Sequence, residues 1–295
     1  MSLPSRNQSR RQNVIAAPPK RHGGLAVLLS ILAVISLLLA VGTGVAKQRV
    51  FNADYLVTEL DKTDAGKQLA EVANAELANV VTDNGLPSSI APQVVTAKAA
   101  QQDLDQTVRN LLAGTSQPVS VSHIVAHTKT KLTSSLSQQS AALADLGTTS
   151  TAVNALANTL ETRLTKELNV PQVTQATQEV KTVRSLITGV FWGTTILTVI
   201  LLLALLWLDH NVFRFAKQFG WIALVSGVIV FIGYFGVSAA GIIEIAAIAA
   251  KSFSTAAAAI GNAVLNSYAI PSYILMGLGI IALLISLLGR KRRKN

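Results

Sequence analysis

Four apolar stretches dominate this sequence, and each is long enough to cross a lipid bilayer as a helix. They cover residues 23–46, 185–208, 219–243 and 272–288, and none of them contains a charged side chain. A helix of about 24 residues rises roughly 36 Å, which exceeds a hydrocarbon core of about 30 Å. For the first stretch the alternative is a cleaved signal peptide, because Gly44-Val45-Ala46 resembles a cleavage site, but a signal core runs only about 7–15 residues. We therefore expect four transmembrane helices, with the first one uncleaved.

Basic residues gather beside these stretches and predict their orientation. One group precedes the first stretch, a second lies within 209–218 and a third follows the last stretch; as topology determinants we take Arg10, Arg11, Lys20, Arg21, Arg214, Lys217, Arg290, Lys291, Arg292, Arg293 and Lys294. Cytoplasmic loops carry an excess of Lys and Arg. We therefore expect a multi-pass protein of the cell membrane with both termini in the cytoplasm. In this interpretation residues 1–22 form a disordered basic tail, 209–218 a cytoplasmic loop and 289–295 a second basic tail.

The net charge of +10 and the isoelectric point near 10.0 come from these groups and not from a folded domain. The long polar segment 47–184 is close to neutral, with a slight excess of acids. A nucleic-acid-binding domain would carry its positive charge on one face of the fold. The distribution of charge along the sequence therefore predicts no nucleic-acid partner and indicates that the basic residues lie beside the lipid bilayer.

Residues 47–184 show helical spacing and no strand-like alternation. Turn signals at 84–87, 114–118, 147 and 169–171 divide the segment. The most regular pattern is a heptad-like seam that predicts one helix from Ile90 to Leu111. Asp54 and Asp64 stand at expected helix starts, where they can cap. Short turns between helices favour antiparallel neighbours, so we expect an all-α protein: four transmembrane helices with an extracytoplasmic antiparallel helical bundle inserted between helices 1 and 2.

The last helix of this segment has no break before the second apolar stretch. It starts at Pro171, a residue suited to a first helical turn, and continues with apolar residues at 3-4 spacing to Ile187. We therefore expect one continuous rod that joins the bundle to the membrane. Such a rod could transmit a movement, or simply hold the domain in place.

Residues 244–271 join the last two apolar stretches and form an expected extracytoplasmic amphipathic linker. Apart from Glu244 and Lys251 the linker is uncharged and rich in Ala. It could lie on the membrane, pack under the bundle or extend the neighbouring spans. The sequence leaves these alternatives open.

Small residues within the spans indicate where helices could approach closely. Gly189 and Gly193 form a GxxxG element in the second span, and Gly236 and Ala240 are four residues apart near the end of the third. Small residues at this spacing let helix backbones meet in lipid. The alternative is that glycine is simply frequent in membrane helices. We take Gly189, Gly193, Gly236 and Ala240 as helix-packing candidates.

The sequence offers little for catalysis or metal binding. It contains no cysteine, so thiolate ligands, Cys nucleophiles and disulfides are excluded. His123 and His127 have the spacing of a two-histidine metal element, but no third ligand lies nearby, and a solvated helix face is the simpler interpretation. No phosphate loop or nucleophile motif is present. We therefore expect no enzyme, no catalytic residue, no cofactor and no metal.

The order of parts resembles a group of uncharacterised integral membrane proteins of Gram-positive bacteria, with one N-terminal span, a helical extracellular domain and three C-terminal spans. The matching stretches are Phe51 to Tyr55, the segment from Pro87 to Leu112 with Gly114 after it, and Phe219-Gly220-Trp221. The resemblance implies the topology and assigns no activity.

Three functions fit this architecture. The first is an envelope protein whose helical ectodomain senses or binds something outside the membrane, with an envelope protein or a second copy of the chain as partner. The second is a component or regulator of a transport system, although the spans carry no ionisable group at mid-membrane, where transport pathways place them. The third is a structural envelope scaffold.

Overall fold

The computed structural model describes residues 23–85, 93–139, 149–168, 171–209, 211–248 and 253–291, and within these ranges the regular elements are all helical. In chain order they are α1 (Gly23–Val45), the π-helical turn η1 (Ala46–Val50), α2 (Ala53–Leu60), α3 (Ala65–Asp83), α4 (Ala97–Ala113), α5 (Ser122–Gln139), α6 (Thr149–Leu168), α7 (Pro171–Asp209), α8 (Val212–Ala239), α9 (Ile242–Ile248), α10 (Ser254–Asn266) and α11 (Ala269–Lys291).

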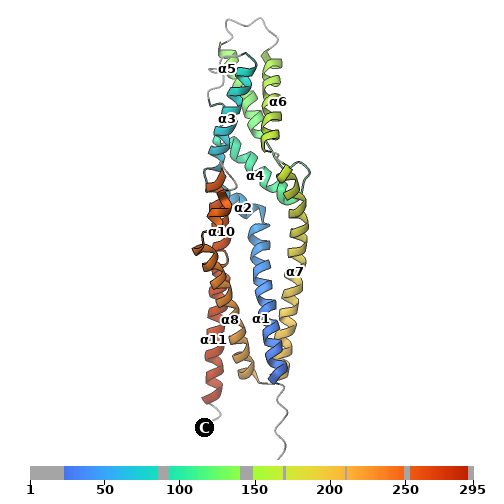
Figure 1. Ribbon diagram of the computed structural model, residues 1–295, viewed down its shortest axis with the longest axis vertical. Helices are drawn as coiled ribbons and strands as arrows, with labels where there is room; N and C mark the ends of the chain where they lie inside the picture. Colours follow the sequence, from blue (N-terminus) through green and yellow to red (C-terminus); the bar gives the residue numbers. More distant parts are fainter. Residues whose placement is uncertain are drawn as a thin grey trace, which may run out of the picture.

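Four of the described helical stretches are long and apolar enough to cross a membrane, which confirms the all-α class with four candidate spans. They are Gly24–Val50, Glu179–Leu208, Val212–Ala239 and Ser254–Leu288. Their outward faces carry large apolar side chains, such as Trp207 at 77% and Leu186 at 61% exposure, as a helix surrounded by lipid requires. Figure 1 shows α1, α7, α8 and α11 side by side in one half of an elongated molecule, with α3–α6 in the other half.

The spans associate in two pairs. Helix α8 packs along α11, and α1 packs along α7. Within the second pair the hydroxyl of Ser36 is buried and lies 2.8 Å from Oγ1 of Thr198. Polar contacts of this kind join helices in a bilayer, where no hydrophobic force acts between them.

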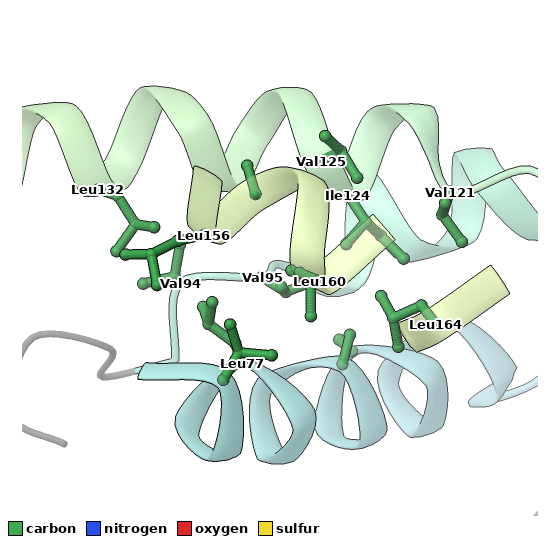
Figure 2. Close-up of a cluster of buried hydrophobic side chains, with 14 of the residues drawn as sticks. Leu77, Val94, Val95, Val121, Ile124, Val125, Leu132, Leu156, Leu160 and Leu164 are labelled. Atoms are coloured by element: carbon green, nitrogen blue, oxygen red, sulfur yellow. The ribbon is translucent and has the colours of Figure 1, made fainter. Parts of the chain in front are cut away.

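The helices α3, α5 and α6 and the segment before α4 share one apolar core. Figure 2 shows Leu77 of α3, Ile124 and Leu132 of α5 and Leu160 and Leu164 of α6 pointing into a common space, with Val94 and Val95 between them. Each of these five helical side chains is fully buried or nearly so. This core makes α3–α6 a helical unit distinct from the spans.

The helix predicted from Ile90 starts later than expected. Residues 86–92 lie outside the described ranges, and α4 begins only at Ala97, where Thr96 accepts a hydrogen bond from the N–H of Ala99. The preceding residues form a non-helical segment, which the Asn74 side chain holds by two hydrogen bonds (2.8 and 2.9 Å) to the main chain of Val95. Hydrogen bonds from a distant side chain to the backbone of Val95 therefore outweigh the helical preference that the apolar spacing predicted.

The predicted loop 209–218 is mostly helix. Helix α7 ends at Asp209 and α8 begins at Val212, so the connection is shorter than expected. The side chain of Asn211 accepts the N–H of Phe213 and caps α8. Arg214 and Lys217 consequently lie on the first turns of a membrane helix rather than in a loop.

The linker 244–271 consists largely of helix and packs against the base of the α2–α4 region. Helix α9 and α10 contact each other, and α10 also contacts α2. Ala256 of α10 is buried in a cluster with Leu60 and Ala65, against which Phe253 and Ile260 pack. Among the three alternatives left open by the sequence, the described part of this segment packs under the helical region and also continues into the fourth span.

Candidate functional site

The junction between the α2–α6 region and the spans is the place where the structure concentrates specific contacts between its two halves. Two helices, α7 and α10, reach this junction from the membrane half (Figure 1). Helix α7 runs unbroken for 39 residues from Pro171 to Asp209, as predicted, which corresponds to about 58 Å. A membrane span thus extends into the neighbourhood of α4 as one rigid element.

The α7 side of the junction is a contact with the C-terminal end of α4. Nη1 of Arg184 donates a hydrogen bond of 3.1 Å to the main-chain oxygen of Leu112. Next to it Gly114 takes the left-handed conformation (φ 74°) that ends α4, and a Cβ there would lie 3.3 Å from the Lys181 side chain. The last carbonyls of a helix lack intrahelical donors, so a cationic donor at this point both satisfies and stabilises the helix end.

The α10 side is built around Tyr55 of α2. Its hydroxyl donates to the main-chain oxygen of Ala263 at 3.0 Å and lies 3.2 Å from Oγ of Ser267. The guanidinium of Arg49 sits over the Tyr55 ring, 4.5 Å from the ring centre. Tyr55 therefore joins the end of the first span, α2 and α10 at one point.

Helix α2 is also tied to α4 by an ion pair. Nη1 of Arg109 lies 2.7 Å from Oδ1 of Asp54. The predicted capping role of Asp54 is wrong, because the cap of α2 is Asn52, whose side chain accepts the N–H groups of Asp54 and Tyr55. Asp64 likewise makes no side-chain capping bond to α3.

A second polar network lies above the junction, where Asp103 of α4 caps α5. Its carboxylate is fully buried and accepts the main-chain N–H groups of His123 (3.0 Å) and Ile124 (2.8 Å). Nδ1 of His123 and the hydroxyl of Ser120 lie 2.9 and 3.0 Å from Oδ1. A carboxylate at a helix N-terminus meets unsatisfied N–H donors and the positive end of the helix dipole. Asp103 thus fixes α5 against α4.

No sequence pattern predicts this role of Asp103. Nothing in its neighbours marks it, because the helix that it caps begins 19 residues further on, at Ser122. Both histidines of α5 make polar contacts, and the His123 side chain stays 47% exposed, in keeping with a solvated helix face. His123 pairs with Asp103, and Nδ1 of His127 lies 3.0 Å from the main-chain oxygen of Val94. Among the described residues no group of three His, Asp or Glu side chains could hold a metal ion.

A polar cavity of about 290 Å³ opens beside this network. It lies between the loop that precedes α5 and the surface of α6, and it is lined by Asn110, Gln117, Val119, Ser120, Val121, Ser122, Glu161 and Thr165. Its lining offers amide, hydroxyl and carboxylate groups, which can recognise a polar ligand or side chain by hydrogen bonding.

The helix-packing candidates do not lie at helix contacts within the chain. A Cβ at Gly189, Gly193 or Gly236 would meet no atom within 4 Å, and Ala240 is exposed. The close approach lies between α8 and α11 instead, where a Cβ at Gly279 would come within 2.9 Å of the main-chain oxygen of Gly220. Glycine spacing alone does not show which face of a helix meets its neighbour. For this reason the predicted positions differ from the observed contact at Gly220 and Gly279.

The four predicted topology determinants that the structure describes fall at one end of the spans. Arg214 and Lys217 are exposed on the first turns of α8, and Arg290 and Lys291 belong to the last turn of α11. Arg10, Arg11, Lys20, Arg21, Arg292, Arg293 and Lys294 lie outside the described residues. Figure 1 places the start of α8 and the end of α11 together, at the end of the molecule remote from α3–α6.

The fold and its apolar helices define a multi-pass, all-helical membrane protein. Comparison with protein-family models, with curated proteins and with solved structures finds no match.

Proposed function

We propose that this chain is a protein of the cell membrane with both termini in the cytoplasm and an antiparallel helical ectodomain, α2–α6, that binds or senses an envelope partner. The orientation is supported by the basic residues at one end of the spans, since Lys and Arg are retained on the cytoplasmic side. The α3–α6 unit then lies outside the cytoplasm.

The observation that carries the proposal is the two-sided junction. The ectodomain is held on α7 through Arg184 and Leu112 and on α10 through Tyr55 and Ala263. A domain that was only linked to the spans by flexible chain would need neither contact. Because both α7 and α10 continue into candidate spans, a displacement of α4 or α2 by a bound partner changes the relative position of two membrane helices.

Labelling of introduced cysteines tests the orientation, and the absence of native cysteine gives it a clean background. A membrane-impermeant maleimide should label Ser116→Cys, at an exposed turn, in intact cells. The matched variant Asn295→Cys, in the basic tail, should be labelled only after the cells are made permeable. The opposite pattern would overturn the orientation.

Photocrosslinking in cells tests the binding function. A photoreactive amino acid at Gln117, which lines the polar cavity, should give a discrete crosslinked species, whereas the same group at Lys62, which is 61% exposed and does not line the cavity, should not. Mass spectrometry then identifies the partner, including a second copy of the chain. Equal and diffuse crosslinking at both positions would contradict a specific partner site.

A further inference from the structure

A large groove lies among the spans, away from the junction. It runs between α1, α8 and α11 at the end of the molecule remote from α3–α6, and its volume is about 1140 Å³. That volume slightly exceeds the range of about 300–1,000 Å³ typical of small-molecule sites. Its walls are mainly aliphatic and aromatic, with side chains that include Ile31, Val34 and Ile35 of α1, Trp221 and Val225 of α8 and Leu283 of α11.

The groove has the length of one leaflet. Along α8 its lining extends from Arg214 to Val225, which corresponds to about 16 Å of helix. Half of a hydrocarbon core of about 30 Å is about 15 Å. An acyl chain that enters at the interface would therefore have apolar wall along its whole path to the middle of the bilayer.

One end of the groove is basic. Arg214 and Lys217 belong to its lining, and both side chains are exposed. Neither forms an ion pair with any carboxylate whose side chain the structure describes. Two unpaired cations at the interfacial end of an apolar groove complement a molecule with one anionic end and a hydrocarbon tail.

Gln218 supplies a third, uncharged polar group at the same end. It lines the groove one residue after Lys217, and its Oε1 is buried without a hydrogen-bond partner among the described residues. A buried amide oxygen is normally satisfied by a donor. A headgroup that carries hydroxyls as well as a phosphate could supply that donor.

We propose that this groove is a binding site for an anionic glycerophospholipid. The acyl chain lies against Ile31, Val34 and Trp221, and the phosphate lies between Arg214 and Lys217. Assignment of the lipid to the cytoplasmic leaflet rests on the orientation proposed above, whereas the site itself does not. Spans α1, α8 and α11 come from both helix pairs, so a lipid held among them would bridge the two pairs.

Quenching of Trp221 fluorescence tests the site. The chain has three tryptophans, so the variant Trp192→Phe/Trp207→Phe leaves Trp221 as a single probe in the groove wall. The protein is placed in nanodiscs of phosphatidylcholine that contain a small, equal fraction of acyl-brominated phosphatidylglycerol or acyl-brominated phosphatidylcholine. We expect brominated phosphatidylglycerol to quench Trp221 more strongly, with an apparent preference of roughly fivefold for each basic side chain that contacts it at low salt.

Three variants localise the effect. Arg214→Gln/Lys217→Gln should abolish the preference, while Lys129→Gln/Lys131→Gln, which removes the same charge from α5, should leave it unchanged. Ser286→Phe, which places a ring in the groove, should reduce quenching by both lipids. Equal quenching by the two lipids in the parent protein, a preference that survives loss of both basic residues, or unchanged quenching in Ser286→Phe would each overturn the proposal.

A second measurement avoids the tryptophan substitutions. Native mass spectrometry of the unmodified chain, released from nanodiscs of the two lipids in equal amounts, should retain phosphatidylglycerol preferentially, and Arg214→Gln/Lys217→Gln should lose this selectivity. Nanodiscs expose both leaflets and contain no envelope partner. Failure of the lipid site is therefore distinguishable from failure of the proposed orientation or ectodomain function.

Discussion

Nη1 of Arg184, on the helix that becomes the second span, donates a 3.1 Å hydrogen bond to the main-chain oxygen of Leu112 in the last turn of α4. This bond crosses from one half of the molecule to the other. Because a helix end lacks intrahelical donors for its final carbonyls, the guanidinium both caps α4 and attaches it to α7. Removal of this one side chain should therefore loosen the α7 side of the junction without disturbing the core of α3–α6.

We expect Arg184→Ala to loosen the end of α4. Loss of a hydrogen bond from a charged donor costs about 1–1.5 kcal/mol at a partly exposed site, so amides in residues 110–116 should exchange with solvent about five to ten times faster. Hydrogen exchange of the full chain in detergent measures this. As a control, Arg163→Ala, which breaks the contacts of α6 with Glu76 and Asp83, should leave this peptide unchanged. Equal rates in Arg184→Ala and the parent would show that the bond does not hold the junction.

Asp103 should be the most sensitive polar residue of the helical region. Asp103→Ala leaves two N–H groups of α5 without an acceptor, a buried one and a partly buried one, so we expect a loss of about 3 kcal/mol in the free energy of unfolding. Asp103→Asn keeps one acceptor and should lose about 1–2 kcal/mol. Urea unfolding of the full chain in detergent, followed through a label on Ser116→Cys, measures both. A loss below about 0.5 kcal/mol for Asp103→Ala would mean that α5 does not depend on this cap.

Asp105 lies two residues further along the same helix, and its replacement should stabilise the fold, whereas replacement of Asp103 should destabilise it. Burial raises the pKa of Asp105 above its ordinary value of 3.8, against a smaller lowering by the hydrogen bond from Gln101. A carboxyl whose pKa is higher in the folded state than in the unfolded state destabilises the fold once it is ionised. That cost is absent below pH 3.8, grows as the pH rises through 3.8 and the folded pKa, and is constant above both.

Asp105→Asn should therefore stabilise the protein slightly at pH 7, by less than about 0.5 kcal/mol because the side chain is only partly buried and solvent screens its charge. The gain should shrink as the pH falls toward 3.8. Urea titrations at a series of pH values compare the variant with the parent. A gain that is independent of pH would show that the carboxylate charge is not its cause.

The sequence was sufficient for those features that depend on local composition. The spans follow from uncharged runs such as 185–208, and the continuous α7 follows from a pattern with no breaker after Pro171. Features that depend on contacts between distant residues were missed. Asn74 holds Val95 in a non-helical segment where a helical seam predicted helix, and no local pattern reveals that bond. The lipid groove was likewise not predicted, because its three walls come from helices far apart in the chain.

The glycines of the spans illustrate the same limit and provide the last prediction. Gly277 and Gly279 both lie on α11, and sequence does not distinguish their surroundings. A Cβ at Gly279 would lie 2.7 Å from the main-chain nitrogen of Leu224 on α8, whereas a Cβ at Gly277 would meet nothing within 4 Å. Because main-chain atoms cannot move aside as a flexible side chain can, the first position has no room for a methyl group.

We expect Gly279→Ala to separate α8 from α11 and to cost about 1–3 kcal/mol. Gly277→Ala should be neutral or stabilising by up to about 1 kcal/mol, because alanine restricts the unfolded chain and fits a helix better than glycine. Titration of the purified protein from a mild detergent into SDS, followed by circular dichroism, gives both unfolding midpoints. If the two variants unfold at the same SDS fraction, then α8 and α11 do not meet at Gly279, and the pairing that forms one wall of the lipid groove is wrong.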